Sequence, residues 1–354
     1  MSKTLLIVNL GTPQAPTPKA VAHYLREFLN DKYVIDIPNP FRRILVSGII
    51  VPTRSRKSAH AYQQVWRDDG SPLMFHSKAF FEKLKSTEKA AGDDGFTVKL
   101  AMRYGQPSLR HELSETIRGG AKEIYVWPMY PQYALSSTET VLNLCREVFA
   151  ETNFRGQSYF IEEFCDNVDV AAVWSDNIAS ANRGFDADHL LLSYHGLPVS
   201  HVKKISAQCE GNGSCSQQKT EKNGQCYRRQ CYETSEVIRR DLFCRAREGV
   251  RFSPRDISIG FQSRLTSGWI QPFSDAFYRE LPKKGVKRLL VACPSFVTDC
   301  LETLEEVAIR GREEFRSHGG DDLKLVPCLN DSDSWVRAAS EIVHDKKKWQ
   351  AFKK

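Results

Sequence analysis

Two series of short apolar runs, each followed by a helical pattern, constrain the fold of this chain most strongly. Runs rich in Val, Ile, Leu and aromatic residues alternate with segments whose apolar residues recur at helical spacing. Such alternation is typical of a parallel sheet covered by helices on both faces. The expected strands are Thr4–Leu10, Thr97–Arg103, Glu123–Pro128, Gln157–Phe164, His189–Tyr194, Asp256–Gln262, Val286–Cys293 and Leu323–Cys328. The clearest helical patterns are Leu109–Arg118, Val141–Ala150, Cys300–Phe315 and Ser334–Lys346.

The second four strands repeat the plan of the first four. The first strand ends in Leu10-Gly11-Thr12-Pro13, and its counterpart ends in His195-Gly196-Leu197-Pro198. We therefore predict an α/β protein with two similar Rossmann-like domains, each a doubly wound parallel sheet, over residues 1–165 and 166–354, with the C-terminal helix free to pack back on the first domain. Ligands of open α/β sheets bind beyond the carboxyl ends of the strands, so functional residues are expected there.

Each predicted domain carries an insertion. The first, over about residues 31–85, mixes apolar side chains with arginine and lysine. It reads either as a lid packed on its own domain or as a segment that touches a membrane surface. The second, over about residues 199–231, is polar and rich in Gly, Asn, Gln and Lys.

The composition excludes several classes of protein. A formal net charge of +7 over 354 residues is mild and does not indicate nucleic-acid binding. No run of about 18 apolar residues is present, so no transmembrane helix is expected. The apolar run Leu5–Val8 is too short for a signal peptide. We therefore expect a cytoplasmic protein, in which ten cysteines are unlikely disulfide partners and invite a search for metal ligands.

A histidine follows the first strand of the second series. His195 comes after the apolar run Leu190–Leu192 and before Gly196, so the turn presents its side chain at the edge of the sheet. A neutral imidazole can bind a metal or accept a proton near neutral pH. The alternative is a structural histidine held by hydrogen bonds, and the local sequence leaves both readings open.

An acidic segment follows the seventh strand. Glu302 and Glu306 are four residues apart and share one face of the expected helix. If that face meets a ligand site, the two carboxylates form an acidic line for a hard cation or for protons. Alternatively, Asp299 caps the helix and Glu302 completes a capping box, because acids also suit a first helical turn.

Other strand ends carry residues suited to a flat ligand with carboxylates. Arg103 and Tyr104 close the second strand, and Trp269 follows a turn after the sixth. An arginine can pair with a carboxylate through a fork of donors, and an aromatic ring can cover one face of a flat ligand. Each of the three could equally be a core residue.

Four cysteines fall within 23 residues, at Cys209, Cys215, Cys226 and Cys231. Four thiolates can hold an iron–sulfur cluster or a tetrahedral zinc. The spacing Cys-x5-Cys-x10-Cys-x4-Cys is not the paired Cys-x2-Cys of zinc knuckles. Free thiols or disulfides are the alternatives. Cysteines in apolar contexts are expected to be buried small hydrophobes, namely Cys145, Cys165 and Cys244.

Taken together, these motifs resemble the ferrochelatase family. Leu192-Ser193-Tyr194-His195-Gly196-Leu197-Pro198 is similar to the family's signature around its catalytic histidine. The segment Ala292–Glu306 resembles the family's acidic helix. Further segments that resemble the family are Val8–Pro13, Gly70–Pro72, Met102–Gly105 and Trp127–Tyr133. The matches run in order from the first strand to the last third of the chain.

The resemblance implies chelatase-like Rossmann domains with a porphyrin cleft between them. It implies a lyase that inserts Fe²⁺ into protoporphyrin IX to form protohaem, the terminal step of haem biosynthesis. No Gly-x4-Gly-Lys-Ser/Thr loop is present, so no ATP is implied. His195 and Glu302 would form the metal site and handle protons, and Glu306 would extend the acidic line. The residues expected around the macrocycle are Leu10, Ser71, Arg103, Tyr104 and Trp269.

Two details refine this resemblance. Some ferrochelatases carry a [2Fe–2S] cluster whose ligands lie mostly near the C-terminus, whereas no cysteine follows Cys328 here. The clustered cysteines favour such a cluster independently, on Cys209, Cys215, Cys226 and Cys231. The family branch that metallates coproporphyrin tends to have a tyrosine at the metal-side position of Leu10, so the leucine resembles the protoporphyrin branch.

The remaining expectations concern partners and rivals. The first insertion resembles the family's lip over the porphyrin mouth, and it is the expected place of peripheral contact with the inner membrane face. No nucleic-acid partner is expected. The alternatives to the main reading are a coproporphyrin III ferrochelatase, a chelatase that metallates a less oxidised tetrapyrrole, and a non-catalytic tetrapyrrole-binding carrier.

Overall fold

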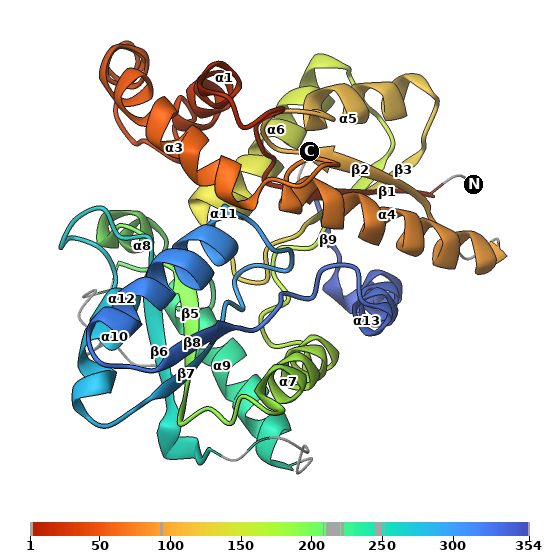
Figure 1. The fold of residues 1–354 in the computed structure, drawn as a ribbon. Helices are drawn as coiled ribbons and strands as arrows, with labels where there is room; N and C mark the ends of the chain where they lie inside the picture. Colours follow the sequence, from red (N-terminus) through yellow and green to blue (C-terminus); the bar gives the residue numbers. More distant parts are fainter. Residues whose placement is uncertain are drawn as a thin grey trace. The chain divides into compact units, whose positions relative to one another are not determined.

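Two units make up the structure, a computed structural model that describes residues 3–92, 95–207, 209, 220, 223–244, 250 and 252–352 (Figure 1). Unit 1 comprises Met1–Tyr130, Leu135–Glu163 and Asp331–Lys354. Unit 2 comprises Pro131–Ala134 and Phe164–Asn330. Unit 1 is therefore assembled from three stretches of chain, and the stretch after Asn330 belongs to it.

Unit 1 is built on a five-stranded sheet with the order β2-β1-β3-β4-β9. The first four strands pair in parallel, and β9 joins the β4 edge in the antiparallel sense. The strands are β1 (Lys3–Asn9), β2 (Thr97–Met102), β3 (Glu123–Pro128), β4 (Gln157–Phe160) and β9 (Gln350–Ala351). The α-helices are α1 (Pro18–Leu29), α2 (Phe41–Ile44), α3 (Val51–Val65), α4 (Pro72–Ala90), α5 (Leu109–Arg118), α6 (Thr140–Glu151) and α13 (Asp333–His344). The strand β1, which lies between β2 and β3, is buried from Thr4 to Asn9, as expected for a strand covered on both faces.

Unit 2 is built on a four-stranded parallel sheet with the order β6-β5-β7-β8. The strands are β5 (His189–His195), β6 (Ile257–Gln262), β7 (Arg288–Ala292) and β8 (Asp322–Leu325). The α-helices are α7 (Val168–Asn182), α8 (Val199–Ile205), α9 (Tyr227–Cys244), α10 (Ser274–Lys283), α11 (Leu301–Thr303) and α12 (Arg312–Ser317). Short 3-10 helices are η4 (Pro254–Asp256) here and η6 (Lys346–Lys348) in unit 1.

The two sheets follow one topology. In each, the first strand in the chain lies between the second and the third, and the fourth lies beyond the third. The expected α/β fold with two similar Rossmann-like sheets is confirmed. All eight expected strands are present, with ends that differ by up to four residues. The largest difference is at β4, which ends at Phe160 although the apolar pattern continues, because a strand ends where its paired hydrogen bonds end.

The acidic helix is continuous along the chain but not regular. Cys300–Phe315 was the expected span, and the structure has α11, a π-helix η5 (Leu304–Gly311) and α12 in succession. Unit 1 has a π-helix η3 (Leu135–Glu139) directly before α6. In each unit, one π-helix follows the third strand of the sheet. Because π-helices are rare and concentrate at functional sites, this repeat draws attention to the same place in each unit.

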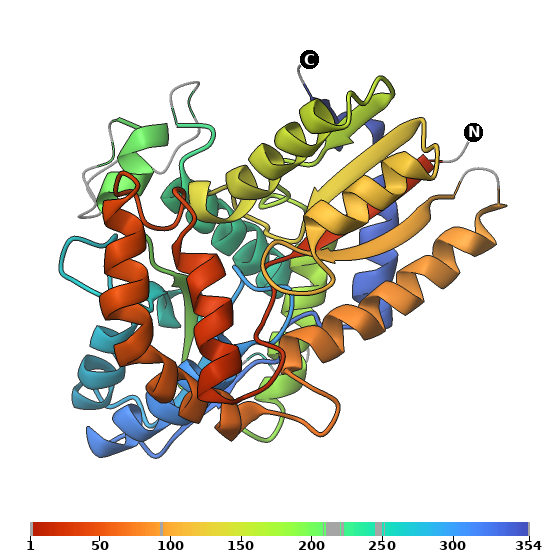
Figure 2. The same ribbon diagram turned by 90° about the horizontal axis from the view of Figure 1, so that it is seen from above.

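The first insertion is helical. It contains α2, a π-helix η1 (Leu45–Ile50) and α3, and its expected range also includes most of α4. The helices α1 and α3 lie side by side (Figure 2), and α4 packs on β2 and α13. Of the second insertion, residues 208, 210–219 and 221–222 lie outside the described residues, and its end overlaps the first turns of α9.

Within the described ranges, no helix combines the length and the apolar character needed to cross a membrane.

Candidate active site

His195 is the last residue of β5, at the carboxyl edge of the unit 2 sheet. Its backbone N–H donates to Ser295 Oγ at 3.0 Å, and its carbonyl oxygen accepts from the Tyr227 hydroxyl at 2.7 Å. The next residue, Gly196, donates its N–H to the Gln262 carbonyl at 2.8 Å. A Cβ atom on Gly196 would lie 2.7 Å from that carbonyl oxygen, so only glycine fits the turn. The backbone around His195 is therefore held on both sides.

The tautomer of the His195 ring follows from one contact. Its Nδ1 lies 2.7 Å from the Gly196 carbonyl oxygen. A carbonyl can only accept, so Nδ1 carries the hydrogen and Nε2 of the neutral ring keeps its lone pair. The ring is half-buried, with the ring centroids of Phe296 and Trp269 6.1 and 6.3 Å away. Nε2 is thus the atom that can bind a metal or take up a proton.

The capping alternative for Glu302 is wrong. The cap of α11 is Cys300, whose N–H donates to Thr303 Oγ1 at 3.1 Å. The Asp299 carboxylate accepts from Thr303 Oγ1 at 2.9 Å and from Asn330 Nδ2 at 2.7 Å. The Glu302 side chain is half-buried and interacts with the Cys300 thiol instead. It is therefore not used to close the helix end.

Glu306, in the π-helix η5, accepts two hydrogen bonds from a single residue, Ser263. The Ser263 N–H and hydroxyl each donate to a Glu306 carboxylate oxygen at 2.7 Å. Burial raises the pKa of Glu306, against the lowering effects of Ser263, His195 and Arg310, while Glu302 raises it further. Both His195 and Glu302 are therefore within electrostatic reach of Glu306, and the structure brings these three candidates into one region of unit 2.

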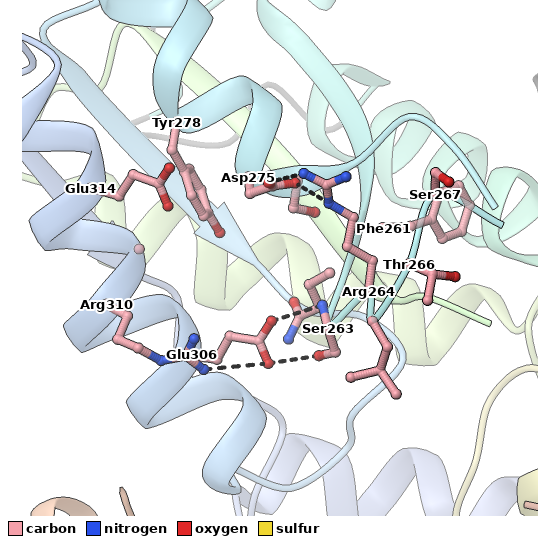
Figure 3. Close-up of a pocket in the computed structure, with 14 residues that line it drawn as sticks. Phe261, Ser263, Arg264, Thr266, Ser267, Asp275, Tyr278, Glu306, Arg310 and Glu314 are labelled. Atoms are coloured by element: carbon pink, nitrogen blue, oxygen red, sulfur yellow. Dashed lines mark hydrogen bonds and ion pairs between the residues drawn. The ribbon is translucent and has the colours of Figure 1, made fainter. Parts of the chain in front are cut away.

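A cavity of about 430 Å³ opens beside Glu306, between the end of β6, the start of α10 and η5 (Figure 3). Its other carboxylates are paired with arginines. Asp275 lies 2.6 Å from Arg264 and 2.8 Å from Arg279, and Arg279 also lies 2.8 Å from Glu314. The Tyr278 hydroxyl is buried beside the cavity with no hydrogen-bond partner among the described residues. The cavity is polar, but its charges are balanced.

In unit 1, the candidates at the ends of β1 and β2 lie together. Tyr104 donates its N–H to the Leu10 carbonyl at 2.9 Å. Asp31 then binds both members of the pair predicted at the end of β2, because its Oδ2 lies 2.5 Å from Arg103 Nη2 and 2.9 Å from the Tyr104 hydroxyl. Thr140 Oγ1 also donates to this oxygen, at 2.5 Å. Two nitrogens of the Arg103 guanidinium are thus bound within the protein, Nε by Thr140 and Nη2 by Asp31.

The remaining candidates have local structural roles. Ser71 is 2% exposed and caps α4, since its hydroxyl accepts from the Met74 N–H at 3.2 Å. Trp269 is half-buried, with its backbone bridged to Pro198 in the turn after His195. The candidate residues therefore divide between the units, with Leu10, Ser71, Arg103 and Tyr104 in unit 1 and His195, Trp269, Glu302 and Glu306 in unit 2.

Three of the four clustered cysteines lie among the described residues. Cys209, Cys226 and Cys231 are each buried, and Cys215 lies outside the described residues. Burial raises the pKa of the Cys231 thiol well above its usual range. In the part of the chain that the structure describes, no three His, Cys, Asp or Glu side chains are gathered to hold a metal ion.

The other cysteines separate into two kinds. Cys145 and Cys165 are buried, as expected, but Cys244 is exposed at the end of α9. The expectation for Cys244 was wrong because the helical pattern around it does not show which face of α9 packs.

Several residues that hold the site escaped the sequence analysis. Asp31, Tyr227 and Ser263 each contact a candidate that is 32 to 73 residues away in the chain. No local motif marks them, because a hydroxyl or a carboxylate looks the same whether it meets water or a distant side chain. Only the short run of Gln262, Ser263 and Arg264 at the end of β6 could have been singled out, by its position at a strand end.

The whole chain matches known proteins. A family model described as Ferrochelatase matches residues 2–347. A ferrochelatase of Coxiella burnetii is 39% identical over 352 residues, which cover 98% of this chain and 94% of the relative. Ferrochelatases of Pseudomonas fluorescens and Pseudomonas aeruginosa are each 40% identical, over 343 and 348 residues, and cover 96% of both chains.

Among solved structures, SirB from Bacillus subtilis with Fe³⁺ has a TM-score of 0.54 and 11% identity. The match covers 98% of this chain and 95% of that chain. At this identity the likeness concerns the fold alone.

Proposed function

The chain belongs to the ferrochelatase family and inserts a metal into a porphyrin in haem biosynthesis, and from this premise we propose that it inserts Fe²⁺ into protoporphyrin IX as an ATP-independent lyase. The observation that carries the mechanism is the His195 ring. Its Nδ1–H is engaged by Gly196, so Nε2 is the free base. Metal insertion releases two pyrrole protons, and a fixed base at the ring is the group needed to take them.

The acidic line then carries the protons away. Glu306 lies within electrostatic reach of His195 and Glu302 and lines the cavity. The other carboxylates of the cavity already face arginines, and Arg310 lies 3.9 Å from Glu306 itself. Because these arginines already offset the charge of the carboxylates, the cavity offers little net negative charge to a divalent ion and suits proton transfer better than Fe²⁺. Glu306→Gln should slow turnover and leave the affinity for porphyrin unchanged.

The decisive experiment is anaerobic metallation of protoporphyrin IX with Fe²⁺, followed by the visible spectrum, for wild type and His195→Ala. Haem formation by wild type and almost none by the variant is the expected result. Conversion by both proteins would remove His195 from its role as the base. Porphyrin binding without conversion by wild type would favour a carrier over an enzyme.

Leu10 supports protoporphyrin as the substrate. An aliphatic side chain at this position resembles the protoporphyrin branch of the family. Parallel assays with protoporphyrin IX and coproporphyrin III should therefore give the higher kcat/KM with protoporphyrin IX. Equal or faster turnover of coproporphyrin III would overturn this assignment.

The [2Fe–2S] cluster stays a prediction that rests on the spacing of Cys209, Cys215, Cys226 and Cys231. No step of the mechanism passes through it. Protein purified without oxygen should contain two iron and two sulfide atoms per chain, as the composition of such a cluster requires. Colourless protein that contains zinc, or no metal, would end this prediction.

We also propose that the protein is cytoplasmic and touches the inner membrane face through α2 and η1. Phe41, Ile44 and Ile49 are 67, 65 and 58% exposed, and Arg42 and Arg43 lie among them. Apolar side chains beside cations suit an anionic lipid surface.

Wild type should float with anionic liposomes, and the double variant Phe41→Ser/Ile44→Ser should not. Val168→Ser, at another exposed apolar residue, is the matched control and should float like wild type. Wild type that stays at the bottom of the gradient would leave these helices as a lid.

A further inference from the structure

Two hydroxyl groups form hydrogen bonds with the His195 backbone, one with its N–H and one with its carbonyl oxygen. The Ser295 hydroxyl accepts from the His195 N–H at 3.0 Å, and the Tyr227 hydroxyl donates to the His195 carbonyl at 2.7 Å. Tyr227 and Ser295 also interact with each other. The Tyr227 side chain is 7% exposed, so its bond to His195 is shielded from water. A shielded pair of this kind fixes where the imidazole of His195 is directed.

Tyr227 is the first residue of α9, so its bond to the His195 carbonyl joins the start of this helix to the end of β5. A phenol has one hydrogen, and here the His195 carbonyl receives it.

A second contact between the same helix and strand provides a reference. The Tyr194 hydroxyl lies 2.7 Å from Ser235 Oγ, and Ser235 Oγ donates to the Cys231 carbonyl at 2.9 Å. This bond also ties α9 to β5 through a buried phenol, but it does not reach His195. Successive side chains of a strand point to opposite faces, so Tyr194 and His195 face apart.

We propose that Tyr227 is a positioning residue, whose hydroxyl sets the place of His195 by joining the first turn of α9 to the end of β5. The inference rests on the proposed role of His195 in metallation. It links α9 directly to the turn that carries the His195 imidazole.

The first test compares Tyr227→Phe with Tyr194→Phe, because both remove one buried phenolic hydroxyl that joins α9 to β5. We expect similar losses of thermal stability. Only Tyr227→Phe should lower kcat for haem formation, by about tenfold, since displacement of a reacting group by a fraction of an ångström has such effects. The Kd for protoporphyrin, from fluorescence quenching, should change less than about twofold in both variants. Equal kcat in the two variants would overturn the proposal, as would a rise in Kd that accounts for the lost activity.

A readout independent of catalysis separates this proposal from the proposed function. Amide hydrogen exchange of the peptide that contains residues 193–197 should speed up in Tyr227→Phe and not in Tyr194→Phe, because only the first frees the His195 turn. Unchanged exchange in Tyr227→Phe would overturn the proposal even in an active enzyme. Faster exchange in a protein that fails to metallate porphyrin would leave the link intact and reject the catalytic role of His195.

Discussion

At Gly11 the backbone leaves no room for a side chain. A Cβ atom there would lie 1.7 Å from the Tyr104 carbonyl oxygen, and φ is +105°. The same turn joins Leu10 to Tyr104, so a shift of Gly11 moves the candidate residues at the ends of β1 and β2. Glycine is thus required here both by the positive φ and by the lack of space beside the Tyr104 carbonyl.

Gly11→Ala should therefore lower the free energy of unfolding by about 3 kcal/mol or more, because the clash adds to the cost of a positive φ. Denaturant unfolding measures the change. Gly70→Ala is the matched control, since φ there is +122° but no atom lies within 4 Å of the added Cβ. It should cost about 1–2 kcal/mol. Equal losses in the two variants would show that the Tyr104 backbone moves aside easily.

Among single residues, the sequence shows the candidates for the site and hides the partners that hold them. His195, Glu302 and Glu306 could be singled out because strand ends and helix faces are local patterns. Three contacts could not be predicted in this way, because each depends on a partner that the fold brings near. They are the bond that fixes the tautomer of His195, the bond from Arg103 to Asp31, and the bond from Ser263 to Glu306.

The helices show a similar division. The N-terminus of α4 has an obvious cap in Ser71, yet the resemblance to ferrochelatases places that residue beside the macrocycle. The structure gives the hydroxyl a helix bond and only 2% exposure. Ser108, which caps α5 through the His111 N–H at 3.2 Å, offers a direct comparison.

Ser71→Ala and Ser108→Ala should each cost about 1 kcal/mol of stability, the usual loss for a helix cap. Thermal unfolding measures that loss, and fluorescence titration with protoporphyrin measures binding. A Kd that rises only in Ser71→Ala would support the contact with porphyrin. The same Kd in both variants would mean that the Ser71 hydroxyl caps α4 and does not contact the porphyrin.

Element types were predictable where periodicity is regular. The spans of α5 and β3 agree with those expected to the residue. The π-helices were not predictable, because a π turn keeps the same apolar and acidic composition as an α turn. Its extra residue is accommodated by tertiary contacts, such as the bonds from Ser263 to Glu306 in η5.

In the whole molecule, the stretch after Asn330 contributes to the core of unit 1. Trp335 of α13 is fully buried and stacks on Phe80 of α4 at 5.4 Å between ring centroids. Glu88, also in α4, accepts from Ser340 at 2.9 Å and lies 2.9 Å from His344. The division of the chain into units therefore follows packing and not the order of residues.

Trp335→Ala should destabilise unit 1 by about 3–5 kcal/mol, the usual cost of removing a buried tryptophan side chain. Trp174→Ala, at an equally buried tryptophan of α7 in unit 2, is the matched substitution. Hydrogen exchange should show faster opening of β1 and β3 in the first variant and of β5 and β7 in the second. Opening of all four strands in both variants would mean that the units unfold together.

The interrupted make-up of unit 1 also has a consequence for biosynthesis. During translation, all of unit 2 is synthesised before Asp331–Lys354 is added. Domains that fold during synthesis usually do so from the N-terminus. Here the sheet of unit 1 begins first and is completed last, because its strand β9 and the helix α13 are synthesised only after all four strands of the unit 2 sheet. A growing chain would therefore hold an incomplete first sheet throughout the synthesis of unit 2, and this is the interval in which a chaperone would find exposed apolar surface.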